Sequence, residues 1–191
     1  MTKGRLEAFS DGVLAIIITI MVLELAAPEG AELAALLPLA PKFLSYVLSF
    51  VFVGIYWNNH HHLLHAIQHV DGRVLWANMH LLFWLSLIPF ATAWVGENRF
   101  AAWPVAVYGA VLLLAAIAFL ILVQALLARH GRGSVLATAM GRNFKGKISP
   151  VIYAAAIALA FVNSWLAFGL YVLVAVIWFV PDRRIERIVI R

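Results

Sequence analysis

The chain has 191 residues, of which 64% are hydrophobic and 12% are charged, and its mean hydropathy is +0.95. Ordinary soluble domains are about half apolar and about a quarter charged, so a soluble fold of this length would leave much apolar surface in water. The sequence contains no cysteine, which excludes disulfides, thiolate metal sites and a cysteine nucleophile.

The first apolar run, residues 9–25, follows a short basic start and predicts a membrane-spanning helix. At ~1.5 Å per residue, this run just crosses a hydrocarbon core of ~30 Å. Asp11 interrupts the run and no small-residue cleavage site follows it, so we interpret the segment as a retained helix and not as a signal peptide.

Five further spans are predicted, which makes the chain one all-α integral membrane domain, residues 1–191, with six transmembrane helices. Pro89 is expected to kink the third span. The apolar stretch 148–180 is too long for one crossing, so a turn near Asn163 and Ser164 is expected to divide it. The five spans cover residues 43–64, 74–95, 104–127, 149–162 and 165–180.

The basic residues fall almost entirely on one side of this topology, and only Lys42 and Arg99 fall on the other. Because Lys and Arg mark the cytoplasmic side, both termini are predicted to be cytoplasmic. Topology thus explains the net charge of +5, and no basic face with interleaved aromatic residues supports nucleic-acid binding. The predicted cytoplasmic residues are Lys3, Arg5, Arg73, Arg129, Arg132, Arg142, Lys145, Lys147, Arg183, Arg184, Arg187 and Arg191.

Polar side chains are predicted at one depth near the cytoplasmic ends of the first three spans. Asp11 is the most unusual of them, because an ionisable group inside a membrane is costly and is a functional candidate. We favour a satisfied hydrogen-bond network between the helices over a proton relay. The set comprises Arg5, Ser10, Asp11, His60, His61, His62, Asn78 and His80.

The histidines of the second span raise a metal site as an alternative. His61 and His65, like His65 and His69, are four residues apart and share a helix face. A zinc site usually needs a third ligand and hydrogen bonds that orient the ligands, and the only carboxylate expected nearby is Asp71. Consecutive histidines also point ~100° apart, so the triplet cannot converge on one ion. We predict no bound metal and no other cofactor.

No catalytic motif is present. The sequence contains no G-x-S-x-G, no H-E-x-x-H and no glycine loop that would cradle a phosphate. Serine and threonine inside membranes more often pack helices together. We therefore predict that the chain is not an enzyme.

The first helix carries an aliphatic stripe, because Ile16, Ile20 and Leu23 recur at i, i+4, i+7 and share one face. Thr19 lies ~60° from Ile16 beside this stripe, whereas Asp11 points ~140° away from it, toward neighbouring helices. Periodicity of this kind more often indicates helix packing than a pore. The stripe also suits a symmetry axis, around which several copies would stack hydrophobic rings.

A dense set of motifs runs through the first half of the chain. The first helix contains Arg5, Phe9-Ser10-Asp11-Gly12-Val13, Ala15-Ile16, Ile18-Thr19 and Val22-Leu23-Glu24, and Trp57, His60-His61, Asn78 and Leu87-x-Pro89-Phe90 follow. In their order and spacing, and in the six-span length, these motifs resemble the transmembrane protein 175 family in its prokaryotic form. The resemblance covers essentially the whole chain.

This resemblance implies a potassium-permeable channel that assembles as a homotetramer, with the first helix lining a pore on the symmetry axis. The carbonyl filter of ordinary potassium channels is absent from the family, and this sequence has no T-V-G-Y-G stretch. By position, Ile16, Ile20 and Leu23 match the hydrophobic pore layers, with Ile16 as the tightest ring and gate. Thr19 matches a polar position linked to selectivity.

The resemblance also implies that Arg5, Phe9, Ser10 and Asp11 tie the first helix to its neighbours, which adds Phe9 to the predicted polar network. Glu24 lies toward the outer mouth, where its charge would attract cations. The expected partners are three further copies of the chain, potassium ions and lipid, and the expected location is the prokaryotic cell membrane, with multiple crossings.

Two other functions stay open. A proton-coupled carrier would use Asp11 and the histidines of the second and third spans as a relay, and slow saturable uptake would distinguish it from a pore. A structural or accessory membrane subunit would carry no flux of its own.

Overall fold

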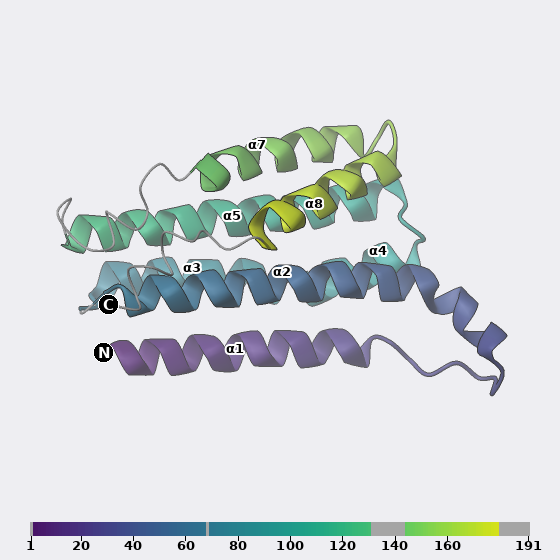
Figure 1. Cartoon of the computed structure of the whole chain (residues 1–191), viewed down its shortest axis with the longest axis horizontal. Coiled ribbons are helices and arrows are strands. Elements are labelled where there is room, and N and C mark those ends of the chain that lie inside the picture. The colour runs from purple at the N-terminus through teal and green to yellow at the C-terminus, as the bar shows by residue number, and fades with distance from the viewer. Residues whose placement is uncertain (1, 68, 131–143, 180–191) are drawn as a thin grey trace.

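The computed structural model describes residues 2–67, 69–130 and 144–179, and all regular secondary structure in these ranges is helical. The long helices lie side by side along one axis (Figure 1). In chain order the elements are α1 (Lys3–Leu23), the 3-10 helix η1 (Leu33–Leu39), α2 (Ala40–His65), α3 (Gly72–Ser86), α4 (Ile88–Glu97), α5 (Ala102–His130), α7 (Phe144–Leu159) and α8 (Ser164–Phe179).

The first two long helices begin earlier than their predicted spans. The apolar run of α1 starts at Phe9, but its polar first turns are helical back to Lys3. α2 begins at Ala40 with Pro41 in its first turn. Because the N–H groups of a first turn have no intrahelical acceptor, the missing N–H of proline costs no hydrogen bond there. Hydropathy therefore marked the apolar part of each helix and not its ends.

The predicted third span contains two helices, α3 and α4, separated at Leu87. Pro89 is the physical cause of the break, because its ring clashes with the carbonyl four residues earlier and it has no N–H to donate. The start of α3 is capped by Asp71, whose Oδ1 accepts a hydrogen bond from the Val74 N–H at 3.0 Å.

The last apolar stretch also contains two helices, α7 and α8, joined by residues 160–163. Asn163 ends the turn: its Oδ1 accepts hydrogen bonds from the backbone N–H groups of Trp165 and Leu166 at 3.0 and 3.1 Å. An asparagine that satisfies the free donors of a helix start is a favoured cap.

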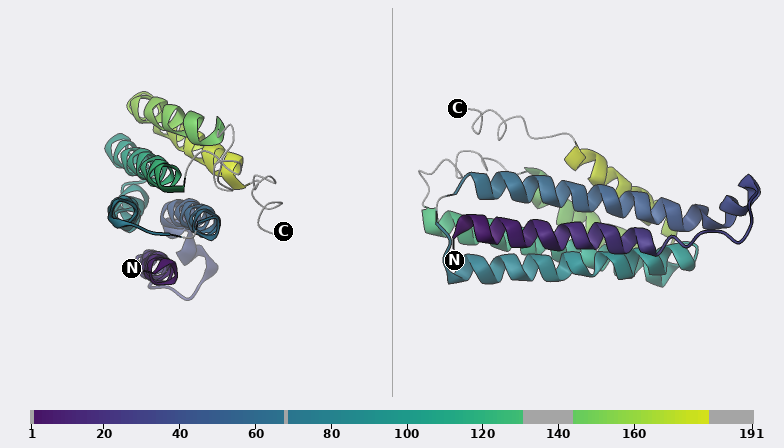
Figure 2. Two further views of the ribbon diagram at one scale, coloured as in Figure 1. Left: turned by 90° about the vertical axis from the view of Figure 1, so that its left-hand side faces the viewer. Right: turned by 90° about the horizontal axis from the view of Figure 1, so that it is seen from below.

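Viewed along the bundle, α1 lies at one edge beside α2 and α3, α5 lies behind these two, and α7 and α8 form the opposite edge (Figure 2). The N-terminus and the ends of α2 and α5 lie at one end of the bundle, whereas the connections from α1 to η1, α4 to α5 and α7 to α8 lie at the other (Figure 1). Arg132, Arg142, Arg183, Arg184, Arg187 and Arg191, which the sequence assigns to the cytoplasm, lie outside the described residues.

Apolar side chains face outward as well as inward. Within the described residues, four helical segments are long and apolar enough to cross a membrane, and α8 is a shorter apolar helix. Large apolar side chains such as Trp76, Trp103 and Phe90 are exposed on the outer surface. In water such a surface would be unfavourable, and in a bilayer it meets lipid tails. The chain is a membrane protein.

Candidate functional site: the first helix and its neighbours

α1 has one face that the rest of the chain covers. Leu6, Ser10, Leu14, Ile17 and Met21 are all buried, at spacings of three and four residues that place them on one side of a helix. This side packs against α2, α3 and α4. The position of α1 at the edge of the bundle leaves its other side uncovered (Figure 2).

The uncovered side, the open face of α1, carries the aliphatic stripe that the sequence singled out. Ile16, Ile20 and Leu23 are 59%, 42% and 78% exposed. Gly12 and Thr19 are exposed on the same side. The Thr19 hydroxyl donates to the Ile16 carbonyl at 2.9 Å, so its oxygen lone pairs remain available to a group outside the helix.

The buried side is fixed by a chain of hydrogen bonds across three helices, here called the Ser10 chain. The Ser10 Oγ donates to the Leu6 carbonyl at 2.9 Å, and the Asn78 amide nitrogen donates to Ser10 Oγ at 3.0 Å. The Asn78 Oδ1 lies 2.7 Å from His60 Nε2, and since an amide oxygen only accepts, His60 carries its proton on Nε2. Ser10, His60 and Asn78 are almost completely buried.

The Ser10 chain joins helices and does not continue as a proton path. The hydrogen bonds run in one direction, from His60 through Asn78 and Ser10 to the Leu6 carbonyl. That carbonyl accepts a hydrogen bond but has no proton to pass on. The second ring nitrogen of His60, Nδ1, is buried and has no partner among the described residues. A buried network of this type holds its members in one arrangement.

Asp11 contacts α2 through a second, more exposed bond. The indole N–H of Trp57 donates to Asp11 Oδ1 at 3.1 Å. The same indole stacks on the His61 ring, with 5.9 Å between ring centroids. The carboxylate therefore points toward the neighbouring helix and away from the open face.

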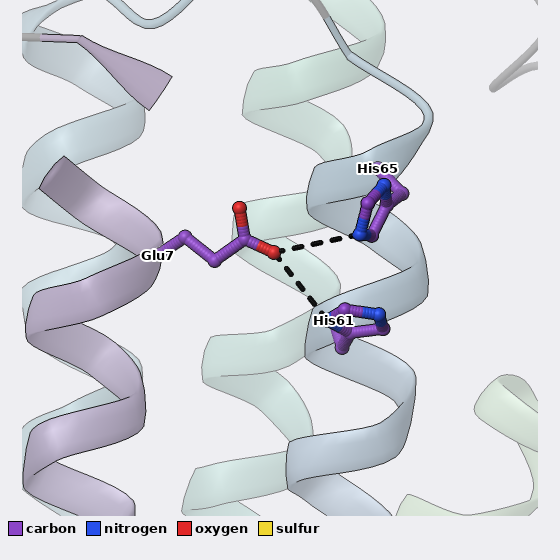
Figure 3. Close-up of side chains that lie close together, drawn as sticks. All are labelled: Glu7, His61 and His65. Carbon is purple, nitrogen blue, oxygen red and sulfur yellow. Dashed lines mark ion pairs between the residues drawn. The ribbon is translucent and has the colours of Figure 1, made fainter. Parts of the chain in front are cut away.

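A third contact between α1 and α2 involves a residue that the sequence interpretation missed. Glu7 Oε1 lies 3.3 Å from His61 Nδ1 and 3.7 Å from His65 Nε2 (Figure 3). The expectation that Asp71 is the only carboxylate near these histidines is therefore wrong. Asp71 caps α3 and lies 3.9 Å from Arg129 Nε. Glu7 is one helical turn before Asp11, and that spacing was the available signal.

Three residues of the predicted polar network stand apart from it. His80 lies two positions after Asn78, about 200° around the helix, and its Nε2 accepts from the Trp84 indole N–H at 2.9 Å within α3. Arg5 is exposed and has no hydrogen bond or ion pair to another described residue. Phe9 is half exposed, one turn before Gly12, and continues the open face.

The opposite end of α1 leads to a small cleft. Glu24 caps the end of the helix, is exposed, and lines this cleft together with Lys42 and Glu97. Lys42 Nζ pairs with Glu97 Oε1 at 3.1 Å, which ties α2 to α4. Glu24 therefore has a charged pair of α2 and α4 as its neighbour.

A second buried polar cluster was not predicted. Ser49 Oγ lies 2.6 Å from Thr92 Oγ1 and 2.9 Å from the Tyr108 hydroxyl, which joins α2, α4 and α5. Isolated serine and threonine residues in apolar runs give no periodic signal, so the sequence offered no way to pair them.

Comparison with known proteins places this arrangement in a family. A family model described as "Endosomal/lysosomal potassium channel TMEM175" matches residues 5–89, the part of the chain that contains the open face, the Ser10 chain and the Glu7 contacts. A protein described as a potassium channel from Chryseobacterium sp. (strain P1-3) is 56% identical over 187 residues, which cover 98% of this chain and 97% of that protein.

Two further matches, one of sequence and one of structure, come from Chamaesiphon minutus. A protein described as a potassium channel is 33% identical over 192 residues, covering 91% of each chain. The crystal structure of a lysosomal potassium-selective channel TMEM175 homolog has a TM-score of 0.80 and 32% identity, and the match covers 92% of this chain and 95% of that chain. Because full-length relatives share both sequence and fold, this chain belongs to the TMEM175 family.

Proposed function

We propose that the chain is a potassium-permeable channel of the cell membrane, formed by four copies around a central axis, with α1 of each copy lining the pore. The observation that carries this proposal is the open face of α1. That face presents Ile16, Ile20 and Leu23, together with Thr19, on a helix at the edge of the bundle. The relatives described as potassium channels support the choice of ion.

One position on the open face is small enough to let α1 approach a copy of itself. Gly12 is exposed, and apart from its chain neighbours and the nearby backbone of its own helix no atom lies within 4 Å of the position that its Cβ would occupy. Small residues allow helices in membranes to come near one another. One turn later Ile16 would then project toward the axis, so four copies would form its narrowest ring.

The filter in this proposal is a hydrophobic ring. An ion that passes four Ile16 side chains must give up part of its hydration shell, and an aliphatic constriction closes to ions when it dewets. Potassium holds its water less tightly than sodium does, so the free energy of partial dehydration is higher for sodium. The Thr19 oxygen, one turn away, offsets part of that cost. Because few oxygens replace the lost water, the preference for potassium should be modest.

The proposed membrane orientation has six spans and both termini in the cytoplasm. Lys3, Arg5 and Arg73 lie at the end of the bundle that holds the N-terminus, whereas Lys42 and Arg99 lie near the other end. This distribution supports the orientation by the positive-inside rule. In this proposed orientation Glu24 would lie at the outer mouth, where its charge would raise the local concentration of cations.

Potassium flux tests the proposal directly. The purified chain is reconstituted alone in potassium-loaded liposomes, and flux is compared with that of Ile16→Asn. A polar ring stays wet, so the substitution is expected to raise flux several-fold. The matched control is Ile121→Asn, which makes the same change at an exposed position of α5, away from the proposed axis. Unchanged flux in Ile16→Asn removes this residue from the pore.

The rival proton-coupled carrier finds less support in the geometry. Asp11 is held by Trp57, and the Ser10 chain that contains His60 ends on a backbone carbonyl. Discrete single-channel current steps would identify a pore, and slow saturable uptake a carrier. Flux through the purified chain alone would exclude a purely accessory role.

A further inference from the structure

Glu7 supplies the third ligand that the sequence interpretation lacked, and against the prediction of no bound metal we infer that Glu7, His61 and His65 form a binding site for a divalent transition-metal ion of the zinc type, which would bridge α1 and α2. Each residue offers one donor atom, and the three donor atoms lie within 4.8 Å of one another. The Glu7 carboxylate extends from α1 toward the two rings on adjacent turns of α2 (Figure 3). The site rests on the geometry of these three side chains and does not depend on the proposed pore.

The spacing between the Glu7 oxygen and each histidine nitrogen is close to that of a coordination sphere. Zinc binds histidine nitrogen and carboxylate oxygen at ~2.0–2.2 Å in a tetrahedral arrangement, which separates neighbouring ligand atoms by ~3.4 Å. Glu7 Oε1 is 3.3 Å from His61 Nδ1 and 3.7 Å from His65 Nε2. Small side-chain rotations would therefore bring three ligands to one ion without a movement of either helix.

The side chains are accessible enough for an ion to enter. The side chains of His61 and His65 are 37% and 45% exposed, and that of Glu7 is 21% exposed. Three protein ligands leave a fourth tetrahedral position on the ion, which a water molecule can fill. The site lies at the end of the bundle that holds the N-terminus, next to the last turns of α2.

The donor set selects the class of metal. Two imidazole nitrogens and one carboxylate suit zinc, cobalt, nickel and copper, whereas magnesium and calcium prefer oxygen ligands. Two histidines four residues apart on a helix present their rings on the same face. The zinc-type ions are therefore expected to bind, and magnesium is expected to be a poor competitor.

Neighbouring groups hold the ligands in place. The Trp57 indole stacks on His61 and donates its N–H to Asp11, so the His61 ring is supported by an anchored side chain. Lys3 Nζ donates to the His65 backbone carbonyl at 3.4 Å. Groups that orient metal ligands in this way raise affinity, because less freedom is lost when the ion binds.

Direct titration tests the site. The full-length protein, with any affinity tag removed, is stripped with a chelator, placed in nanodiscs and titrated with zinc chloride by calorimetry. One zinc per chain is expected, with no displacement by excess magnesium. Cobalt(II) should bind at the same stoichiometry and give the strong visible absorption of a tetrahedral complex. Neither readout requires ion flux, so failure of the metal site and failure of the proposed channel are distinguishable.

Three variants locate the ion. Glu7→Gln and His65→Ala each remove one ligand and should weaken zinc binding at least about tenfold. His80→Ala is the matched control, because it removes a histidine that bonds within α3, and it should bind zinc like the parent protein. Glu7→Gln preserves side-chain size, so it decides the question if His65→Ala does not fold. Absence of zinc binding, or equal affinity in Glu7→Gln and the parent, overturns the inference.

Discussion

The Trp57 indole N–H bonds to the Asp11 carboxylate at 3.1 Å, across the contact between α1 and α2. This bond gives the one acidic residue deep in α1 a partner on the neighbouring helix. Together with the Ser10–Asn78 bond and the contacts of Glu7, it secures α1 from its covered side only. The contacts that hold α1 in the bundle and its open face are thus on opposite sides of the same helix.

Replacing Trp57 tests the first of these supports. Trp57→Phe keeps an aromatic ring beside His61 but removes the donor to Asp11. The acceptor is a charged carboxylate, but the hydrogen bond is partly exposed to solvent. The free energy of unfolding is therefore expected to fall by about 0.5–1.5 kcal/mol. Thermal unfolding in nanodiscs measures it. The control is Trp76→Phe, at an exposed position without a hydrogen bond to a described residue, and an equal midpoint for both variants would contradict the prediction.

Ser10→Ala is expected to be more costly than its size suggests. The substitution leaves the buried Asn78 amide nitrogen without its acceptor, and an unsatisfied buried donor costs about 1–3 kcal/mol. Ser86→Ala is the matched control, because Ser86 is exposed and bonds only to its own helix, at the Phe83 carbonyl. The two proteins are compared by unfolding in detergent. A smaller effect for Ser10→Ala than for Ser86→Ala would show that the Ser10 chain does not support α1.

Close packing of α5 on α8 can be tested at a glycine. A Cβ on Gly109 would overlap the Tyr171 hydroxyl, which donates to the Val105 carbonyl at 3.1 Å. Gly109→Ala should therefore destabilise the protein by about 1–3 kcal/mol, as overpacked cores do. Gly169→Ala, on α8 with open space around it, should be neutral or slightly stabilising because alanine favours helix.

A second substitution separates overlap from helix propensity. Tyr171→Phe removes the hydroxyl oxygen, the nearest atom that the new methyl group would meet, while the Tyr171 ring carbon and Ile157 stay close, so Gly109→Ala should cost somewhat less in that background. Additive losses in the double variant would mean that overlap with the hydroxyl oxygen does not cause the loss in Gly109→Ala.

Helix content and the open face followed from the sequence because they depend on hydropathy and period, and both are local. Pro89 was expected to kink the third span, and the structure interrupts that span at Leu87, between α3 and α4, while residues 72–97 together stay long and apolar enough to cross a membrane. Glu7 was missed because its partners lie more than fifty residues away, on α2. The contacts of Ser49 with Thr92 and Tyr108 likewise required knowledge of which helices are neighbours.

Two substitutions of Thr19 separate the contribution of its hydroxyl oxygen to selectivity from that of its side-chain shape. Thr19→Val keeps a β-branched side chain of similar volume and removes the hydroxyl, whereas Thr19→Ser keeps the hydroxyl. If the oxygen offsets part of the dehydration cost at the neighbouring Ile16 ring, Thr19→Val should lower the preference for potassium over sodium and Thr19→Ser should retain most of it. Reversal potentials under bi-ionic conditions in planar bilayers measure the preference. Because the hydroxyl bonds only to the Ile16 carbonyl of its own helix, neither change removes a contact between helices. A preference that survives in Thr19→Val would assign selectivity to the aliphatic rings alone.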